Sequence, residues 1–202
     1  KKKKTEAMLP DNGGRNLVSW AEFAFDENHK ITAYRVDTRC NLGAYNSQFG
    51  QPIQSQLFSK VLMGVYDVQD TYLHVEGYYT NTVQVDAYRG AGRPEAIYVL
   101  ERLMDRAARE LGVDPWELRR INFIKPDQFP YTTATGELYD VGDFARLLTR
   151  AGEEADCEGF AARRTADAKA ACCGGRACVT ISKAFWAILQ KGPKWSLRRM
   201  AA

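Results

Sequence analysis

AYRGAGRPE, residues 87–95, is the stretch around which the chain is organised. A strand-like segment leads into it, and an amphipathic helix follows it. Gly90 and Gly92 allow a tight turn and a close approach to the backbone, because neither carries a Cβ atom. The proline of this stretch suits the first position of a helix. Backbone N–H groups at that helix start, beside Arg89 and Arg93, predict a site for an anion or an oxo group. The alternative is an ordinary glycine-rich turn with solvated arginines.

Composition limits the class of protein. The chain has 202 residues, 45% hydrophobic and 26% charged, with a formal net charge of +3. This is enough for one large domain or two small ones, and no basic face with interleaved aromatic residues suggests nucleic acid as a partner. No apolar run approaches the roughly 20 residues of a membrane span. Five cysteines without a signal peptide favour a reducing, cytoplasmic setting. Neither His29 nor His74 has a partner at metal-ligand spacing, so we expect no metal ligand there.

Alternating patterns predict the strands. Residues 17–25 and 31–38 alternate in polarity around a polar turn, which is typical of a β-hairpin. Residues 72–80 predict a further strand. Residues 41–45 break the pattern, and the segment up to residue 56 is expected to be a loop or a short helix entered late. Residues 57–65 fit either a helical turn or an extended run.

Helical spacing follows the central turn. Apolar residues recur there at intervals of three and four, which predicts one buried helix face: Ile97, Leu100, Met104, Ala107 and Leu111. The remaining positions are mostly charged and are expected to face water: Glu101, Arg102, Asp105, Arg106, Arg109 and Glu110. Gly112 is a stop signal, and Asp114 begins a second helix that continues to about Asn122. The Arg119-Arg120 pair either faces solvent or holds an acidic neighbour. A third helix is expected to begin at Asp143, with an acid near its start that suits the helix dipole.

Several short motifs occur in a consistent order along the chain. They are Asn41-Leu42-Gly43-Ala44-Tyr45, Thr80-Asn81-Thr82, residues 86–95, residues 101–112, Arg119-Arg120-Ile121-Asn122-Phe123-Ile124, residues 130–136, Tyr139-Asp140 and Gly142-Asp143-Phe144. Together they resemble the molybdenum-binding large subunit of the molybdenum hydroxylases, the group of xanthine dehydrogenase, aldehyde oxidase and aerobic carbon monoxide dehydrogenase. The resemblance runs from about Thr5 to Arg163. It implies an α+β fold of mixed β-strands with packed helices, part of the first molybdopterin-binding domain of that subunit.

The resemblance also implies chemistry. Members of the group are oxidoreductases that hydroxylate a carbon centre, or oxidise carbon monoxide, with oxygen drawn from water. A molybdenum-pterin, in bacteria usually molybdopterin cytosine dinucleotide, passes electrons through [2Fe–2S] clusters to FAD. These groups usually sit on partners, an iron–sulfur small subunit and an FAD medium subunit. Arg89 matches the cofactor-contacting arginine, and Gly90, Ala91 and Gly92 match the loop beside the metal's ligands. The family's catalytic glutamate lies near the end of a much longer subunit, so no catalytic residue is assigned here and the isolated fragment is expected to be inactive.

Departures from the family narrow the expected substrates. Carbon monoxide dehydrogenases carry a reactive cysteine where this chain has Gly90, so that chemistry is not expected. Purine-oxidising members have a phenylalanine at the position of Ala91 and an arginine at that of Leu57, so xanthine is not expected either. An aldehyde or another heterocycle remains. The competing interpretation is a non-catalytic remnant or interaction module that keeps only the fold. A nucleotide-binding domain would need a downstream acid and a βαβ context, which are not evident.

The end of the chain departs from the resemblance. We therefore divide the chain into a partial molybdopterin-binding domain, residues 1–166, and a divergent tail, residues 167–202. Three cysteines gather in the tail: Cys172, Cys173 and Cys178. Their spacing differs from the family's iron–sulfur pattern and lacks a second ligand pair, so we assign no metal to them. Degenerate codons permit a shifted reading frame that resembles the family's own continuation, which suggests a frameshift as a hypothesis.

Overall fold

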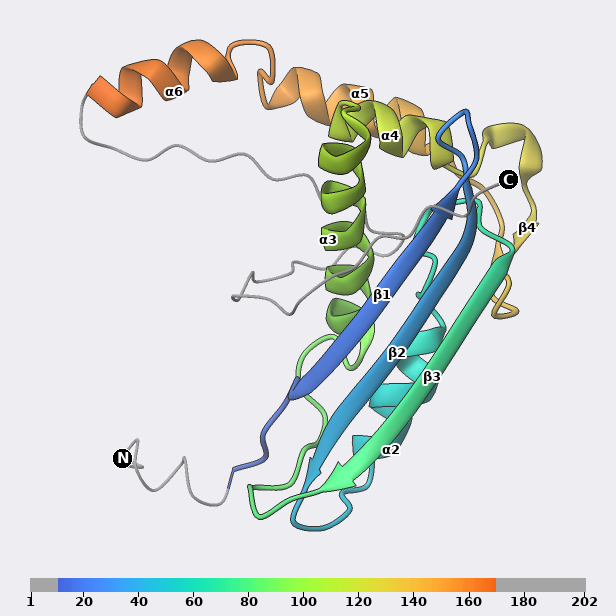
Figure 1. The fold of residues 1–202 in the computed structure, drawn as a ribbon, viewed down its shortest axis with the longest axis vertical. Helices are drawn as coiled ribbons and strands as arrows, with labels where there is room; N and C mark the ends of the chain where they lie inside the picture. The colour runs from blue at the N-terminus through green and yellow to red at the C-terminus, as the bar shows by residue number, and fades with distance from the viewer. Residues whose placement is uncertain (1–10, 170–202) are drawn as a thin grey trace.

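A three-stranded sheet covered on one face by helices forms the framework of the protein (Figure 1). The structure, a computed structural model, describes residues 11–169 of the chain. Its elements run in the order β1 (Leu17–Phe25), β2 (Ile31–Gly43), α2 (Gly50–Pro52), η1 (Ile53–Leu57), β3 (Asp70–Tyr79), α3 (Arg93–Leu111), α4 (Pro115–Asn122), η2 (Pro126–Gln128), β4 (Tyr131–Thr132), β5 (Leu138–Tyr139), α5 (Phe144–Glu154) and α6 (Phe160–Lys169). The predicted α+β class with mixed strands and packed helices is confirmed.

The sheet has the order β1-β2-β3 and combines both kinds of pairing. β1 and β2 form the predicted antiparallel hairpin, and their alternation places Ser19, Ala21 and Phe23 in the interior. β3, the predicted third strand, runs parallel to β2, so the chain must cross over between them. The predicted break at residues 41–45 was wrong in its first three positions. β2 continues to Gly43 because Asn41 still pairs with β3 before the register shifts.

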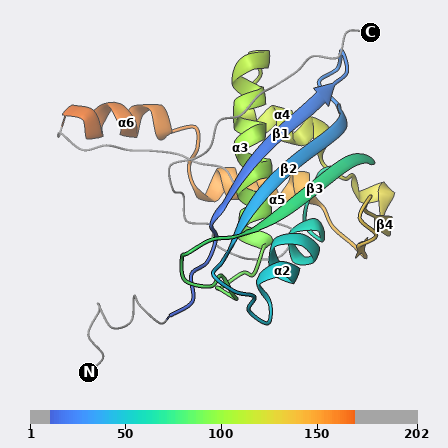
Figure 2. The same ribbon diagram turned by 60° about the horizontal axis from the view of Figure 1, so that its bottom comes forward.

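The crossover from β2 to β3 contains the predicted late helix. It begins with α2 and continues as the π-helical segment η1. The chain then enters the core, where Leu62 and Tyr66 are fully buried. Residues 57–65, which the sequence left open, therefore finish a helix and continue as turns. Figure 2 shows α2 below the sheet, close to the loops that surround the start of α3.

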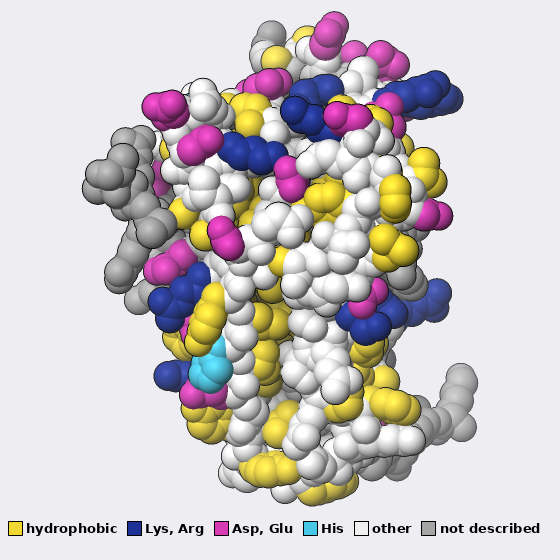
Figure 3. Space-filling model, turned by 90° about the vertical axis from the view of Figure 1, so that its right-hand side faces the viewer, with side chains coloured by type: hydrophobic (Ala, Val, Ile, Leu, Met, Phe, Trp, Pro, Cys, Tyr) yellow, Lys and Arg dark blue, Asp and Glu magenta, His cyan; other side chains and the backbone are white. Residues whose placement is uncertain are grey.

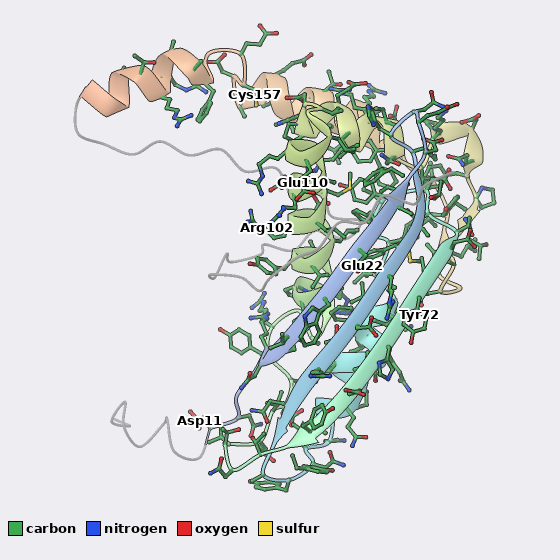
Figure 4. The ribbon with its side chains drawn as sticks, in the orientation of Figure 1. Asp11, Glu22, Tyr72, Arg102, Glu110 and Cys157 are labelled. Carbon is green, nitrogen blue, oxygen red and sulfur yellow. The ribbon has the colours of Figure 1, made fainter. Side chains whose placement is uncertain are left out.

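Helix α3 crosses the inner face of the sheet. Its predicted apolar face is buried from Ile97 to Ala107, while Leu111 packs on the edge of the core. The helix ends at Gly112, whose φ of +70° closes it in the left-handed conformation. Asp114 caps α4 by accepting hydrogen bonds from the next turn, as predicted. Figure 4 shows Arg102 and Glu110 on the side of α3 turned away from the strands.

One part of the charged face of α3 was predicted wrongly. Glu101 is 3% exposed and Arg119 is 0% exposed. Arg119 donates from Nε and Nη2 to Glu101 Oε2, at 3.0 and 2.8 Å, and from Nη2 to Asp105 Oδ1 at 2.9 Å. Tyr66 donates to Glu101 Oε1 at 2.8 Å. Arg119 therefore holds acidic neighbours, and is not solvated, because α4 packs against α3 at this point.

Some predictions fall outside the described residues. These are the cysteines at positions 172, 173 and 178, together with the proposed frameshift. The division after residue 166 stays a prediction. Within residues 11–169, no helix is both long and apolar enough to cross a membrane.

Candidate cofactor-binding turn

The predicted site is a pair of overlapping turns in the loop that leads into the lower end of α3 in Figure 1. The N–H of Ala91 donates to the carbonyl of Tyr88 at 2.8 Å, and the N–H of Arg93 donates to the carbonyl of Gly90 at 3.2 Å. Three successive residues have positive φ: Gly90 at +100°, Ala91 at +46° and Gly92 at +86°. The first turn, residues 88–91, needs a positive φ at its third residue, Gly90. The second turn, residues 90–93, needs a positive φ at both central residues, Ala91 and Gly92. The backbone therefore folds tightly at these residues.

The two glycines of the turn are required by space as well as by conformation. A Cβ atom at Gly92 would lie 2.2 Å from the carbonyl oxygen of Ile53 and 3.0 Å from the nitrogen of Phe58. A Cβ atom at Gly90 would lie 2.3 Å from Cγ of Pro94. Both distances near 2 Å are below any tolerable contact, so the turn packs directly on the backbone of η1 and on the first turn of α3.

Two of the motifs singled out in the sequence meet where β2 and β3 end. Asn41 donates from Nδ2 to Thr82 Oγ1 at 2.9 Å and accepts at Oδ1 from Thr80 Oγ1 at 2.7 Å. The N–H of Thr80 donates to the carbonyl of Gly43 at 2.9 Å, and the N–H of Ala44 to that of Thr82 at 3.0 Å. These contacts join the end of β2 to the segment that leads into the turn. The two motifs therefore fix the start of the segment that runs toward the turn.

The charges near the turn have different surroundings. Arg89 is exposed, and among residues 11–169 its guanidinium forms no hydrogen bond or ion pair. Arg93 instead donates from Nη1 to the carbonyl of Gly90 at 3.1 Å, so its guanidinium is partly occupied within the turn. The first turn of α3 also has an anion of its own, the carboxyl group of Glu95. Arg89 is thus the cation of this group that is available for a ligand.

Burial raises the pKa of Glu95. Its side chain is 8% exposed, and the loss of hydration outweighs the opposing effects of Arg15 and of the N–H groups of Glu95 and Gly92. The nearby thiol of Cys40 is 1% exposed. Burial, followed by the charge of Glu95, raises the pKa of Cys40 to about 12. This cysteine is therefore an unreactive core residue rather than a nucleophile.

Sequence reasoning missed Arg15. Its guanidinium lies 4.5 Å from the ring centroid of Tyr88, and its Nε lies 3.3 Å from Glu95 Oε1. Its Nη2 also donates to the carbonyl oxygen of Arg89. Nothing in the local pattern distinguishes this arginine from a surface residue, because its partners lie more than 70 residues away along the chain.

The surface around the turn is rich in exposed hydrophobic side chains. Six of them lie at the end of β3, in the loop after β2 or in the segment that leads into the turn: Tyr45, Phe49, Tyr78, Tyr79, Val83 and Tyr88. On the face along β3, charged side chains lie at the upper end and at both edges near mid-height, whereas hydrophobic side chains predominate at the lower end (Figure 3). Leu57, the position compared with a substrate-binding arginine, is half-buried in η1, the segment on which Gly92 packs. The end that bears the turn is thus suited to contact with an organic ligand or with further protein.

The turn can bind, but it offers little for proton transfer. Within residues 11–169, no three His, Cys, Asp or Glu side chains are grouped so that they could hold a metal ion. The available elements are one exposed guanidinium and backbone with positive φ. Such a combination recognises oxygen atoms of an anionic group, because guanidinium presents a planar set of N–H donors.

The family comparison agrees with these observations. Residues 2–123 match the family described as the molybdopterin cofactor-binding domain. The carbon monoxide dehydrogenase large chain of Hydrogenophaga pseudoflava is 33% identical over 147 residues, which cover 72% of this chain and 18% of that protein. The large subunit of nicotine 6-hydroxylase of Paenarthrobacter nicotinovorans is 30% identical over 168 residues, covering 82% of this chain and 20% of that protein.

A solved structure gives the same result. Quinoline 2-oxidoreductase from Pseudomonas putida 86 has a TM-score of 0.75 and 30% identity, over 84% of this chain and 22% of that one. The resemblance predicted from the motifs is therefore confirmed. The chain spans only about a fifth of the length of the curated relatives it matches.

Proposed function

The chain belongs to the molybdopterin cofactor-binding domain family, and from this premise we propose that its turn contacts a molybdenum-pterin cofactor. The residues proposed to do so are Arg89, Gly90, Ala91 and Gly92. One observation carries the proposal. Arg89 extends its guanidinium from a turn whose backbone has positive φ at three successive positions, and no described residue pairs with it.

The turn fits the chemistry of that group. A molybdenum-pterin carries oxygen atoms, including phosphate oxygens, that accept hydrogen bonds from a planar guanidinium. Gly90 and Gly92 let the turn pack on Pro94 and on the backbone of Ile53 without a clash, which holds the backbone from which Arg89 projects. The bound group supplies the redox chemistry. The residues of this chain bind and orient it.

For the whole protein we propose a molybdenum hydroxylase-type oxidoreductase. It hydroxylates an aldehyde or heterocycle carbon with oxygen from water, in the cytoplasm. The cofactor is molybdopterin cytosine dinucleotide, and electrons pass to [2Fe–2S] clusters and FAD on a small and a medium partner subunit. Relatives named for nicotine and quinoline, both heterocycles, support this choice.

Gly90 argues against the cysteine-dependent oxidation of carbon monoxide, despite the similarity to a carbon monoxide dehydrogenase. A cysteine needs a Cβ atom, and at Gly90 that atom would lie 2.3 Å from Pro94. The backbone of this turn would have to change before a cysteine could stand there. The sequence departure at this position thus has a steric counterpart in the structure.

Cofactor content tests the proposal. The chain would be purified, with its proposed partner subunits, from bacterial cells that synthesise the molybdenum cofactor. Molybdenum would be measured by elemental mass spectrometry and pterin by fluorescence after oxidation. We expect Arg89→Ala to lower both by about tenfold, which is the loss of one good charge-assisted contact.

Arg150→Ala is the matched control, because Arg150 is also exposed and lies on α5, away from the turn. It should retain the wild-type content. Full content in Arg89→Ala would refute the assignment of this residue. Absence of molybdenum and pterin from the wild-type protein would instead favour the non-catalytic interaction module.

A further inference from the structure

The segment before β1 lies directly against the chain that leads into the turn. The N–H of Gly13 donates to the carbonyl of Gln84 at 2.9 Å, and the N–H of Asp86 donates to the carbonyl of Gly13 at 3.1 Å. A Cβ atom at Gly14 would lie 3.0 Å from Cβ of Tyr88, so the absence of a side chain there permits the approach. The two segments therefore run side by side for a few residues, and Arg15 emerges at the turn.

The guanidinium of Arg15 contacts both ends of the turn. Its face covers the ring of Tyr88, with Cζ 4.5 Å from the ring centroid. One edge donates to the carbonyl oxygen of Arg89, and Nε lies 3.3 Å from Glu95 Oε1. A planar guanidinium can make these three kinds of contact at once, whereas an ammonium group cannot. Arg15 thus connects the first residues of the turn to the first turn of α3.

Glu95 depends on this contact. Its carboxyl group is 8% exposed, and Oε2 has no hydrogen-bond partner in the described part of the chain. Arg15 is the cation that pairs with it. Removal of the guanidinium would leave a buried carboxyl group without its counter-charge, which favours a rearrangement of the helix start.

The backbone of Arg89 is held, although its side chain is not. The exposed guanidinium of Arg89 has no partner among residues 11–169, so the direction in which it leaves the protein is set by its own peptide groups. Arg15 binds the carbonyl group of one of these peptides. The orientation of that peptide plane fixes where the side chain of Arg89 begins.

We propose that Arg15 is the positioning residue of this turn: it fixes the peptide of Arg89 so that the Arg89 guanidinium is directed at the cofactor. The direction of the Arg89 guanidinium toward the cofactor rests on the proposed function. The fixing of the turn by Arg15 does not rest on it, and it is measurable without any cofactor.

Local protection of the turn tests the proposal. Hydrogen–deuterium exchange would be followed for peptides covering residues 86–95 in the 202-residue chain. Brief native digestion with trypsin adds a second measure. Within that range trypsin can cleave after Arg89, whereas the bond after Arg93 precedes a proline and resists it. We expect Arg15→Ala to raise exchange and cleavage after Arg89 by about tenfold, with the circular dichroism of the chain unchanged.

Arg39→Ala is the matched control. Arg39 also combines a ring contact, 5.1 Å from the centroid of Trp20, with an ion pair, 3.3 Å from Glu76, but it lies on the outer face of the sheet. It should leave the turn protected. If Arg15→Ala fails to fold, Arg15→Lys replaces it: the lysine keeps the charge beside Glu95 but cannot also cover the ring and hold the carbonyl, so we expect an intermediate increase. The proposal would be overturned if the turn in Arg15→Ala were as well protected as in Arg39→Ala. If Arg15→Lys has to be used instead, the same comparison applies to it.

Cofactor content then separates the two proposals. Arg89→Ala should lose pterin while its turn stays protected, because the removed guanidinium holds nothing within the chain. Arg15→Ala should lose both. Suppose that the turn opens in Arg15→Ala but Arg89→Ala keeps its full pterin content: this result would contradict the proposed function and leave the fixing of the turn by Arg15 intact. Suppose instead that the turn opens in Arg15→Ala and the same variant keeps its full pterin content: this result would overturn the role of Arg15 in directing Arg89.

Discussion

Replacement of Arg119 by methionine tests how the two helices are held together. Methionine has a similar length and no charge, so the change removes the guanidinium with little loss of volume. The wild-type residue is 0% exposed and donates at 2.8–3.0 Å to Glu101, to Asp105 and to the carbonyl of Pro115. In the variant, Asp105, with its side chain 29% exposed, can recover hydration, whereas Glu101, at 4%, cannot.

The expected magnitude follows from the carboxylate left behind. Breaking a buried ion pair by removing one partner destabilises a protein by about 3–5 kcal/mol, because the remaining charge is uncompensated. Summing the individual hydrogen bonds would exceed this value, since they share a single buried pair. A loss of about 3–5 kcal/mol is a large fraction of the roughly 5–15 kcal/mol by which a typical domain is stable.

Equilibrium unfolding in urea, followed by circular dichroism, measures the effect. Arg106→Met is the control, because Arg106 pairs with Glu110 on the exposed face of α3 and should change stability by about 0.5 kcal/mol or less. Replacing both Arg119 and Glu101 by methionine should recover most of the loss, since no buried charge remains. A loss of less than about 1 kcal/mol in Arg119→Met, or a double variant no more stable than the single one, would refute this reasoning.

Two further predictions concern the turn. Gly92→Ala should destabilise the chain by about 3 kcal/mol, because its Cβ would lie 2.2 Å from the carbonyl oxygen of Ile53 at a φ of +86°. Gly112 has a similar φ of +70° but nothing within 4 Å of its Cβ position, so Gly112→Ala should lose only about 1 kcal/mol in the same urea unfolding assay. Equal losses in the two variants would contradict the steric argument. The raised pKa of Glu95 means that the folded state binds this proton more tightly than the unfolded state. Its contribution to stability is therefore present below the ordinary pKa of 4.5 and is lost as pH rises through the folded-state pKa. Melting temperatures measured across that range should fall less steeply for Glu95→Gln than for the wild type, and parallel curves would contradict the assignment.

Periodicity was enough to locate most secondary structure. The alternation of residues 17–25 and the spacing of apolar residues in α3 each report a surface that is half buried, and burial is what makes a pattern visible in a sequence. The cap at Asp114 marked the start of α4, because its carboxylate satisfies N–H groups that the helix leaves unpaired. Asp143 was predicted as the first residue of the next helix, and it is the cap of α5. The glycines of the turn were recognised for the same kind of local reason.

Long-range partners could not be predicted in this way. Strand pairing between β2 and β3 is parallel, and no local pattern specifies that direction. Glu101 was predicted to face water because charged residues on an amphipathic helix usually do. Its burial depends on Arg119, 18 residues further on, and the role of Arg15 depends on partners still more distant. Residues of this kind are invisible until the segments are brought together.

The pairing of the N-terminal segment with the turn has a consequence for folding order. The contact between Arg15 and the carbonyl of Arg89 joins residues 74 positions apart. Closing a flexible loop of that length loses about 4 kcal/mol of chain entropy, before a constant term is added. Helices α3 and α4 are adjacent in sequence and need no such closure, so they can form early. The end that bears the turn is then among the last parts of the molecule to be assembled, and a nascent chain acquires its proposed ligand-binding surface only after the rest of the framework is in place.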